Sequence, residues 1–162
     1  MSNLGLEVAL RAAGIEFRRA AVGDRYVLSM LREAQGILGG ETSGHILCLD
    51  KTTTGDGLVV ALQVLAVMKQ TGLSLAELTA GMRKFPQILL NVKVAQRFDP
   101  TTVPAIATAV RRIEQRLGGE CRVVLRASGT EPVIRVMVEG RDETETRAAA
   151  TELAAVVKDA AG

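Results

Sequence analysis

Arginine and hydroxyl side chains gather around one glycine in the second half of the chain. The set is Arg126, Ser128, Gly129, Thr130 and, nine residues after the first of these, Arg135. A glycine-containing loop between strands can turn several backbone N–H groups toward one point, and such a concavity binds anions. Flanking guanidinium groups add paired hydrogen bonds to phosphate oxygens. The residues indicate a phosphate site, although an ordinary hairpin loop with solvated arginines has the same composition.

A second candidate site is the glycine-rich turn that contains Glu41, Ser43 and His45. A carboxylate and a hydroxyl on one turn can accept and donate hydrogen bonds to neighbouring sugar hydroxyls. A plain polar turn before a strand is the alternative. His45 is the only histidine, and we expect it to lie too close to Ser43 along the chain to act as the base of a nucleophile. A hydrolase triad is therefore not predicted.

A third candidate is the turn that holds Asp24 and Arg25. Asp24 is most simply predicted to cap the helix that follows. A cation at a helix start opposes the helix dipole, so Arg25 is a candidate to face a ligand. Asp56 is likewise predicted to be a helix cap rather than a metal ligand. The chain has no Asp-x-Asp loop, so no Mg²⁺ site is expected among its own residues.

The first half of the chain alternates predicted helices and short strands. The predicted strands are Ile15–Val22 and His45–Leu49, and the predicted helices are Leu4–Ala13, Arg25–Gln35, Leu58–Thr71 and one that runs from Ser74 to near Phe85. Leu58–Thr71 is apolar on nearly all sides, which predicts a buried helix. Ser74 and Glu77 have the spacing of a capping box.

The second half has a different pattern. Strands are predicted at Ile88–Gln96, Cys121–Arg126 and Val133–Glu139, and helices at Pro100–Leu117 and Glu143–Ala160. Strand, helix, hairpin and helix make a small α+β unit. We therefore expect two domains, an α/β domain at residues 1–86 and an α+β domain at residues 87–162.

Composition limits the classes of partner and location. Of the 162 residues, 48% are hydrophobic and 23% charged, and 20 basic against 18 acidic residues give a net charge of +2. The chain can therefore form a core, and neither nucleic acid nor a membrane surface is an expected partner. The longest apolar run, Leu58–Met68, is shorter than the ~20 residues that span a bilayer. With no signal peptide and with Cys48 and Cys121 expected to be reduced, the cytoplasm is the predicted location.

Three long segments occur in the order found in one known family. They are Gly39–His45 (GGETSGH), Asp50–Gly57 (DKTTTGDG) and Arg126–Gly140 (RASGTEPVIRVMVEG). The chain resembles the α-D-phosphohexomutases over its whole length, and residues 1–7 and 22–27 fit the bacterial subgroup that acts on glucosamine phosphates. Members of this family have four domains. The resemblance implies a partial α/β third domain, without its opening strand, followed by a complete small α+β C-terminal domain.

The resemblance also implies roles for the candidate residues. Arg126, Ser128, Gly129, Thr130 and Arg135 would hold a phosphate; Glu41 and Ser43, with His45 beside them, would bind the sugar; Asp24 and Arg25 match a further active-site turn. The family interconverts glucosamine 6-phosphate and glucosamine 1-phosphate through a 1,6-bisphosphate and an enzyme phosphoserine.

The parts of the family that this chain does not match carry the phosphoserine and the Asp-rich loop for Mg²⁺. The sequence is therefore expected to be a piece of a longer enzyme, starting at an internal methionine and inactive alone. Its expected partners are a hexosamine phosphate and the remaining domains of the same enzyme, and the sequence does not determine an oligomeric state. The alternatives are a non-catalytic module that binds sugar phosphates, or a sister mutase for glucose or mannose phosphates.

Overall fold

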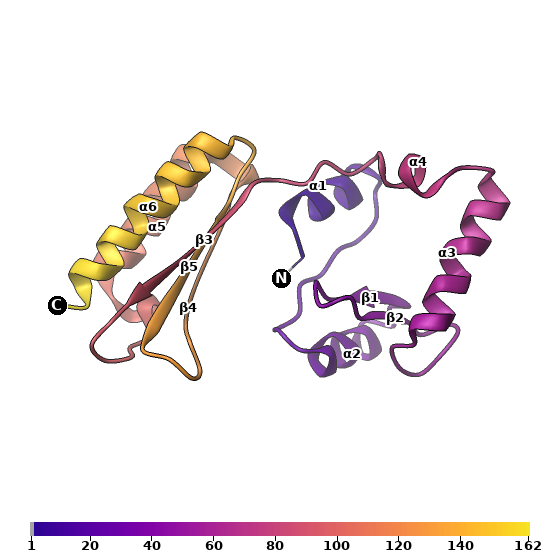
Figure 1. The fold of residues 1–162 in the computed structure, drawn as a ribbon, viewed down its shortest axis with the longest axis horizontal. Helices are drawn as coiled ribbons and strands as arrows, with labels where there is room; N and C mark the ends of the chain where they lie inside the picture. Colours follow the sequence, from indigo (N-terminus) through magenta and orange to yellow (C-terminus); the bar gives the residue numbers. More distant parts are fainter. Residues whose placement is uncertain (1) are drawn as a thin grey trace. The chain divides into compact units, whose positions relative to one another are not determined.

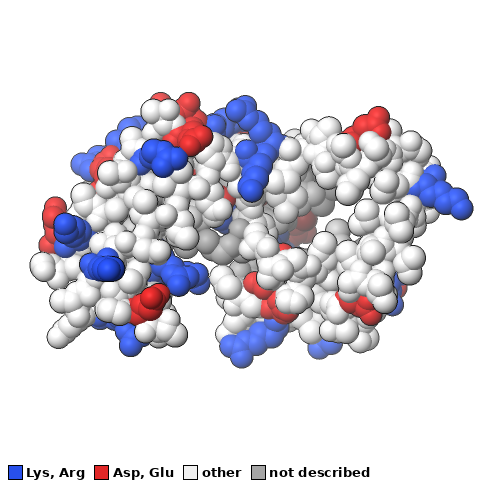
Figure 2. All heavy atoms as spheres, in the orientation of Figure 1, with Lys and Arg blue, Asp and Glu red and all other residues white. Residues whose placement is uncertain are grey.

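The computed structural model describes residues 2–162, which separate into two compact units. The first unit comprises Ala9–Arg83 with Ser2, and the second comprises Lys84–Gly162 with Asn3–Val8. Helix α1 (Leu4–Ala12) contributes its first five residues to the second unit. Among the described residues, no helix combines the length and apolar character that crossing a membrane requires. Figure 2 shows positive and negative side chains interspersed on the face that it draws.

The second unit is a three-stranded antiparallel sheet with two helices on one face (Figure 1). Its elements are β3 (Gln87–Lys93), α5 (Pro104–Leu117), β4 (Arg122–Ala127), β5 (Val133–Glu139) and α6 (Glu143–Ala160). The strand order is β3-β5-β4, so the last strand lies in the middle. Helix α6 packs on β3 and β5, and α5 packs beside α6. The α+β architecture predicted for this half is confirmed.

Alternate residues of β5 build the core of this unit. Successive strand residues point to opposite faces, so every second residue of β5 meets the helices. The branched aliphatic core side chains with no exposed surface are Ile106, Ile113, Ile134, Val136, Val138, Leu153 and Val157. Each such side chain stabilises the fold by about 1.5–3 kcal/mol when fully buried. The core thus fixes the opposite face of β5 as the one that carries Arg135 and Glu139, with Met137 between them.

The predicted helix Pro100–Leu117 is interrupted. A 3₁₀ turn covers Pro100–Thr102, and α5 begins only at Pro104. Proline pushes the preceding residue out of the helical region, and Val103 is accordingly extended, with ψ of 117°. The proline at the first helical position, which the prediction did not weigh, explains the break.

The first unit holds a two-stranded antiparallel ribbon and helices. Its elements are α2 (Asp24–Glu33), β1 (Leu38–Gly40), β2 (Ile46–Cys48), α3 (Gly57–Thr71) and α4 (Leu75–Thr79). Helix α2 packs on β1. A Cβ on Gly39 would lie 2.7 Å from Leu31 Cδ1 and 2.8 Å from Val27 Cγ1, so a larger residue there would force these side chains of α2 to shift.

Two predicted caps in this unit are confirmed. The Asp56 side chain accepts hydrogen bonds from the N–H groups of Leu58 and Val59 at the start of α3. Ser74 and Glu77 form the predicted capping box of α4. The helix predicted to reach Phe85 ends at Thr79, because the chain turns at Ala80 and Gly81 and glycine is a poor helix former.

Two other predictions for the first half are wrong. Ile15–Val22 is not a strand, because among the described residues no neighbouring strand pairs with it. Helix α3 is not buried: none of its residues is, and Leu58 is 80% exposed. The reason is geometric. The ribbon against which α3 packs, through β2, has two strands of three residues and offers too small a surface to cover an apolar helix.

Asn3 joins three distant segments of the second unit. Its amide oxygen accepts from the Phe85 N–H at 2.9 Å, and its amide nitrogen donates to the Phe85 carbonyl at 3.0 Å and to Glu139 Oε1 at 3.1 Å. Glu139 is fully buried and forms an ion pair with Arg122 at 2.7 Å. The start of α1 is thereby held to the end of the sheet at which β3 and β4 begin and β5 ends.

We expect Asn3→Ala to lower the free energy of unfolding of the second unit by roughly 1–3 kcal/mol, because the Phe85 backbone groups and a buried carboxylate lose a partner. Urea denaturation followed by circular dichroism measures the change. Asn91→Ala, on an exposed position of β3, is the matched control. Equal effects of the two substitutions would contradict the role given to Asn3.

Cys48 and Cys121 are both free thiols, in different units. Burial raises the pKa of the Cys121 thiol to about 11, and the charges of Glu114 and Glu139 act in the same direction. Only the thiolate reacts with alkylating agents.

We therefore expect iodoacetamide to modify Cys121 slowly in the folded chain at pH 8. A pKa of about 11 leaves roughly a hundredth of the thiolate of a cysteine with the ordinary value of 9.0. The rate should rise with pH up to about 11. Peptide mass spectrometry on Cys48→Ser measures it, with the urea-unfolded chain as the fast control. A folded-state rate that matches the unfolded one at pH 8 would refute the shift.

Candidate functional site

Ser128 fixes the shape of the loop between β4 and β5. Its N–H donates to the Val133 carbonyl at 2.8 Å, and its Oγ accepts from the Glu131 N–H at 3.4 Å. The residue is buried. Its backbone N–H is therefore used within the hairpin, and the hydroxyl proton is the donor that Ser128 can offer to a ligand.

Arg97 lies in the segment after β3, outside the β4–β5 hairpin, and stabilises the same loop by hydrogen bonds. Its guanidinium donates to the Gly129 carbonyl at 2.6 Å and to the Ser128 carbonyl at 3.5 Å. In residues 2–162, the N–H groups of Gly129 and Thr130 have no hydrogen-bond partner. At the tip of the loop, the carbonyls of Ser128 and Gly129 are thus occupied while the N–H groups of Gly129 and Thr130 are open, which is the arrangement of an anion site.

Arg97 was not among the residues singled out by the sequence. The only signal for it is positional: Lys93 at the end of β3 pairs with Val133 at the start of β5, so the segment after β3 reaches the loop. That register is known only once the sheet has formed.

Two arginines face each other across the hairpin. Arg126 on β4 is the register partner of Arg135 on β5. Both lie on the sheet face opposite the helices, because Ile134 and Val136 on either side of Arg135 are buried in the core. Like charges directly opposite each other destabilise a sheet. An anion bound between them would remove this cost.

A hollow of about 430 Å³ lies beside these residues. It is lined by Arg97, Phe98, Asp99, Pro100, Leu125, Arg126 and Ala127. The five candidate phosphate residues lie in one hairpin. Of these five, Arg126 lines the hollow, together with the guanidinium of Arg97.

The second candidate loop is the turn of the β1–β2 ribbon. The Glu41 N–H donates to the His45 carbonyl at 2.8 Å, and the Gly44 N–H to the Glu41 carbonyl at 3.1 Å. Gly44 has a φ of 96°, a conformation that favours glycine. Ser43 Oγ lies 3.4 Å from Glu41 Oε2. A carboxylate and a hydroxyl are thus presented together on one tight turn.

The turn at Asp24 meets this loop within the first unit. Glu41 Oε1 accepts from the Gly23 N–H at 2.8 Å, and Asp24 Oδ2 lies 3.1 Å from His45 Nδ1. The prediction that Asp24 caps α2 is wrong: the cap residue is Gly23, without a side-chain hydrogen bond, and Asp24 is the first helical residue. Its carboxylate points to His45 instead.

Arg25 contacts the aromatic side chain next to it. Its guanidinium donates to the Tyr26 hydroxyl at 2.6 Å and lies 4.6 Å from the centre of the Tyr26 ring. The cation at the helix start is therefore held by a neighbour within the turn.

The side chains of Ser43 and His45 lie within hydrogen-bond distance, with Oγ 3.1 Å from Nδ1. The expectation that two residues so close along the chain do not form such a pair assumed an extended segment, whereas the tight turn folds both side chains onto the same side. Asp24 reaches the same ring nitrogen, however. A hydrolase triad requires serine and aspartate on opposite nitrogens of the imidazole, so the arrangement is not a triad.

The same cluster is the group in residues 2–162 that comes nearest to a metal site. One ligand atom from each of Asp24, Glu41 and His45 lies within 4.8 Å of the others. Mg²⁺ prefers oxygen ligands in octahedral geometry, and an imidazole beside an exposed carboxylate does not fit that preference. The Mg²⁺ of the resemblance is therefore not assigned to these residues.

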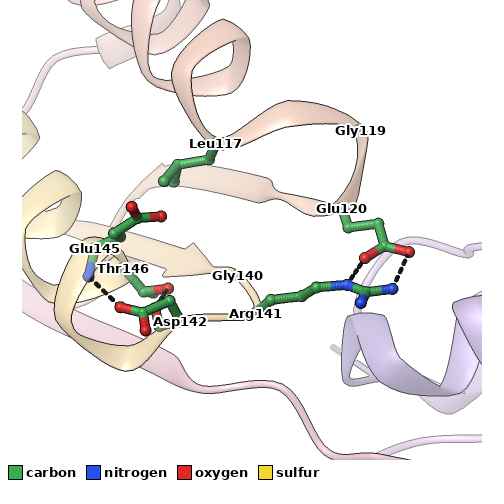
Figure 3. Close-up of a pocket in the computed structure, with 8 residues that line it drawn as sticks. All are labelled: Leu117, Gly119, Glu120, Gly140, Arg141, Asp142, Glu145 and Thr146. Carbon is green, nitrogen blue, oxygen red and sulfur yellow. Dashed lines mark hydrogen bonds and ion pairs between the residues drawn. The ribbon is translucent and has the colours of Figure 1, made fainter.

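Another hollow, of about 320 Å³, lies where α5 leads into β4 and β5 into α6 (Figure 3). Arg141 is paired with Glu120 across it, and Asp142 accepts from the Glu145 N–H to cap α6. Its polar groups hold the two connections together, so its role is structural.

Two family models match the chain. The model "Phosphoglucomutase/phosphomannomutase, alpha/beta/alpha domain III" matches residues 1–85, and that of the C-terminal domain matches residues 89–156. The chain belongs to the phosphoglucomutase/phosphomannomutase family.

Within this family, the chain is similar to bacterial phosphoglucosamine mutases. It is 57% identical to the enzyme of Methylococcus capsulatus over 157 residues, 97% of this chain and 35% of the relative. It is 54% identical to that of Aeromonas hydrophila over 99% of this chain and 36% of the relative. The chain spans about a third of the length of these curated relatives.

Solved structures support the fold. Aspergillus fumigatus N-acetylphosphoglucosamine mutase in complex with glucose 1,6-bisphosphate superposes with a TM-score of 0.76 at 20% identity, over 99% of this chain and 37% of that one. The same fungal enzyme in complex with GlcNAc-6P and magnesium gives 0.57 at 28% identity, over 68% of this chain and 22% of that one.

We expect Arg97→Ala to loosen the loop without unfolding the sheet, because the Ser128 and Gly129 carbonyls lose their donor. Amide hydrogen exchange of Ser128 and Glu131, whose N–H groups are hydrogen-bonded within the loop, should become faster by about fivefold or more, the equivalent of ~1 kcal/mol for one hydrogen bond. Exchange in β5 should not change. Lys93→Ala, which removes an exposed cation at the end of β3, is the control for the loss of charge alone. Unchanged amide exchange of the loop in Arg97→Ala would contradict the stabilising role given to Arg97.

Proposed function

We propose that this chain is the substrate-holding part of a phosphoglucosamine mutase, which interconverts glucosamine 6-phosphate and glucosamine 1-phosphate. Membership of the family and 57% identity to a phosphoglucosamine mutase support the class of enzyme. The single observation that supports the binding role is the opposition of Arg126 and Arg135 beside a loop with open N–H groups.

The β4–β5 hairpin holds the phosphate that does not react. Gly129 and Thr130 offer backbone N–H groups, and Ser128 offers a hydroxyl proton. Arg126 and Arg135 supply two guanidinium groups, which bind phosphate oxygens in pairs. Arg97 acts behind the loop by keeping the carbonyls of Ser128 and Gly129 away from the anion.

The β1–β2 turn binds the sugar. The Glu41 carboxylate accepts hydrogen bonds from hydroxyl groups, and Ser43 both donates and accepts. Glu41 is already held by the Gly23 N–H, so the carboxylate is oriented before a sugar arrives. Pre-oriented groups lose less entropy on binding.

Phosphate binding by one loop and sugar binding by the other suit a mutase that binds its sugar in two orientations, one for each phosphoryl transfer. In the proposed reaction a phosphoserine of the enzyme gives its phosphoryl group to glucosamine 6-phosphate, the resulting 1,6-bisphosphate reorients, and the other phosphoryl group returns to the serine. Mg²⁺, when bound elsewhere in such an enzyme, supplies positive charge at the transferring group. The residues of this chain hold whichever phosphate is not transferring and the sugar hydroxyls in both orientations.

We expect inorganic phosphate to bind this chain weakly at the β4–β5 loop. An NMR titration should shift the amides of residues 127–130, with affinity in the millimolar range, because solvated ion pairs contribute only ~0.2–1 kcal/mol each. Arg126→Ala should weaken binding by roughly fivefold.

Arg111→Ala is the matched control for this titration, since Arg111 is exposed on α5 and away from the loop. It should leave the affinity unchanged. Shifts that do not concentrate in residues 127–130, or an equal response from the two variants, would overturn the phosphate role.

A further inference from the structure

Three polar side chains lie in a row across the sheet of the second unit. Asn91 on β3 is the register partner of Arg135 on β5, and Arg135 is in turn the partner of Arg126 on β4. The row lies on the sheet face opposite α5 and α6 (Figure 1), because the neighbouring strand residues Val92 and Ile134 are buried in the core. Directly opposed side chains on one face have Cβ atoms about 4.5–5.5 Å apart. Asn91 and Arg126 therefore flank Arg135 on its two sides.

Asn91 is the neighbour in the sheet that can hold the Arg135 guanidinium. Within residues 2–162, none of the three side chains of this row has a hydrogen bond or ion pair. A guanidinium has N–H donors and no acceptor, so Arg126 repels Arg135 and cannot orient it. The other strand positions around Arg135 on this face are apolar or cationic: Leu89, Val124, Val133, Met137 and Lys93. The amide oxygen of Asn91 is thus the side-chain acceptor that the strands place beside Arg135.

We infer that Asn91 is a positioning residue of the phosphate site, which accepts a hydrogen bond from the Arg135 guanidinium and so directs it toward the anion. The inference rests on the proposed function, in which Arg135 binds phosphate. One N–H of the guanidinium is sufficient for this contact, so the others remain for phosphate oxygens. The acceptor on one side of Arg135 also offsets the repulsion from Arg126 on the other.

The neutrality of Asn91 matters as much as its oxygen atom. A carboxylate at this position would form an ion pair with Arg135 and stabilise the sheet, since opposite charges directly across two strands attract. The same carboxylate would occupy the guanidinium and repel a bound phosphate. An amide orients the guanidinium without cancelling its charge. Stability and anion binding are therefore expected to change in opposite directions when Asn91 becomes an acid.

The test titrates inorganic phosphate into the full 162-residue chain and follows the amides of residues 127–130 and the side-chain Nε–H of Arg135 by NMR. Asn91→Leu removes the acceptor at nearly unchanged size. It should weaken phosphate binding by about two- to fivefold, as expected for the loss of one hydrogen bond. The Arg135 Nε–H signal should shift in the free variant, which shows that the side chain has lost a partner.

A double-mutant cycle shows whether Asn91 acts through Arg135. Arg135→Lys keeps the charge but replaces the planar guanidinium by a compact ammonium group, whose direction matters less. In that background Asn91→Leu should have no further effect on phosphate affinity. Arg126→Lys is the matched control background, in which the two- to fivefold loss caused by Asn91→Leu should persist.

Asn91→Asp tests the requirement for a neutral group. It should raise the midpoint of urea denaturation while it weakens phosphate binding by more than Asn91→Leu does. Gln115→Glu is the matched control, because it makes the same change from amide to carboxylate at an exposed position of α5, on the other face of the sheet. This control should leave the phosphate affinity nearly unchanged.

Three results would overturn the inference: an unchanged phosphate affinity in Asn91→Leu, an equal loss in the Arg135→Lys background, or equal affinities of Asn91→Asp and Gln115→Glu. In each case residues 127–130 of the wild type still respond to phosphate, so the phosphate role of the hairpin survives. A wild type in which these residues do not respond would instead defeat the proposed function itself.

Discussion

The position of β5 between β3 and β4 is the constraint on which the candidate phosphate site depends. Because β5 pairs with both neighbours, its register is fixed from two sides. A slip by one residue would turn Ile134, Val136 and Val138 out of the core. The burial of these three side chains therefore holds Arg135 opposite Arg126, on the other face of the sheet. Apolar packing on one face thus maintains an unfavourable charge pair on the other.

The same register decides where the β4–β5 loop lies and how Arg97 reaches it. Ser128 closes the hairpin onto Val133, and the end of β3 is carried beside that point by its pairing with Val133. Arg97 then reaches the loop carbonyls from the segment after β3. With the Ser128 and Gly129 carbonyls held by Arg97 and the N–H groups of Gly129 and Thr130 open, the loop needs little reorganisation when an anion binds. At the opposite end of the sheet, Asn3 and the buried Glu139–Arg122 pair fix the chain entering β3.

The first unit differs from the second in how much of its apolar surface is covered. Its ribbon is short, and helix α3 has an apolar surface that the described residues leave exposed. Even so, the turn of its β1–β2 ribbon is well defined, since the Glu41 N–H donates to the His45 carbonyl and the Gly44 N–H to the Glu41 carbonyl. Local hydrogen bonds are sufficient to shape a turn, whereas covering a helix requires a sheet of adequate width. This is why the sequence predicted the turns but overestimated the burial of the helix.

The sequence by itself determined the features that depend on near neighbours along the chain. These include the caps at Asp56 and Ser74, the bounds of α6 and β5, and the identity of the two loops, because hydrogen bonds within a turn and the periodicity of apolar residues are local properties. Tertiary structure decided the rest. The brace from Arg97, the meeting of Asp24 with His45 and the link from Asn3 to Glu139 join residues 21 to 136 positions apart. No local pattern encodes such pairs, because they arise only when strand register and packing bring distant segments into contact.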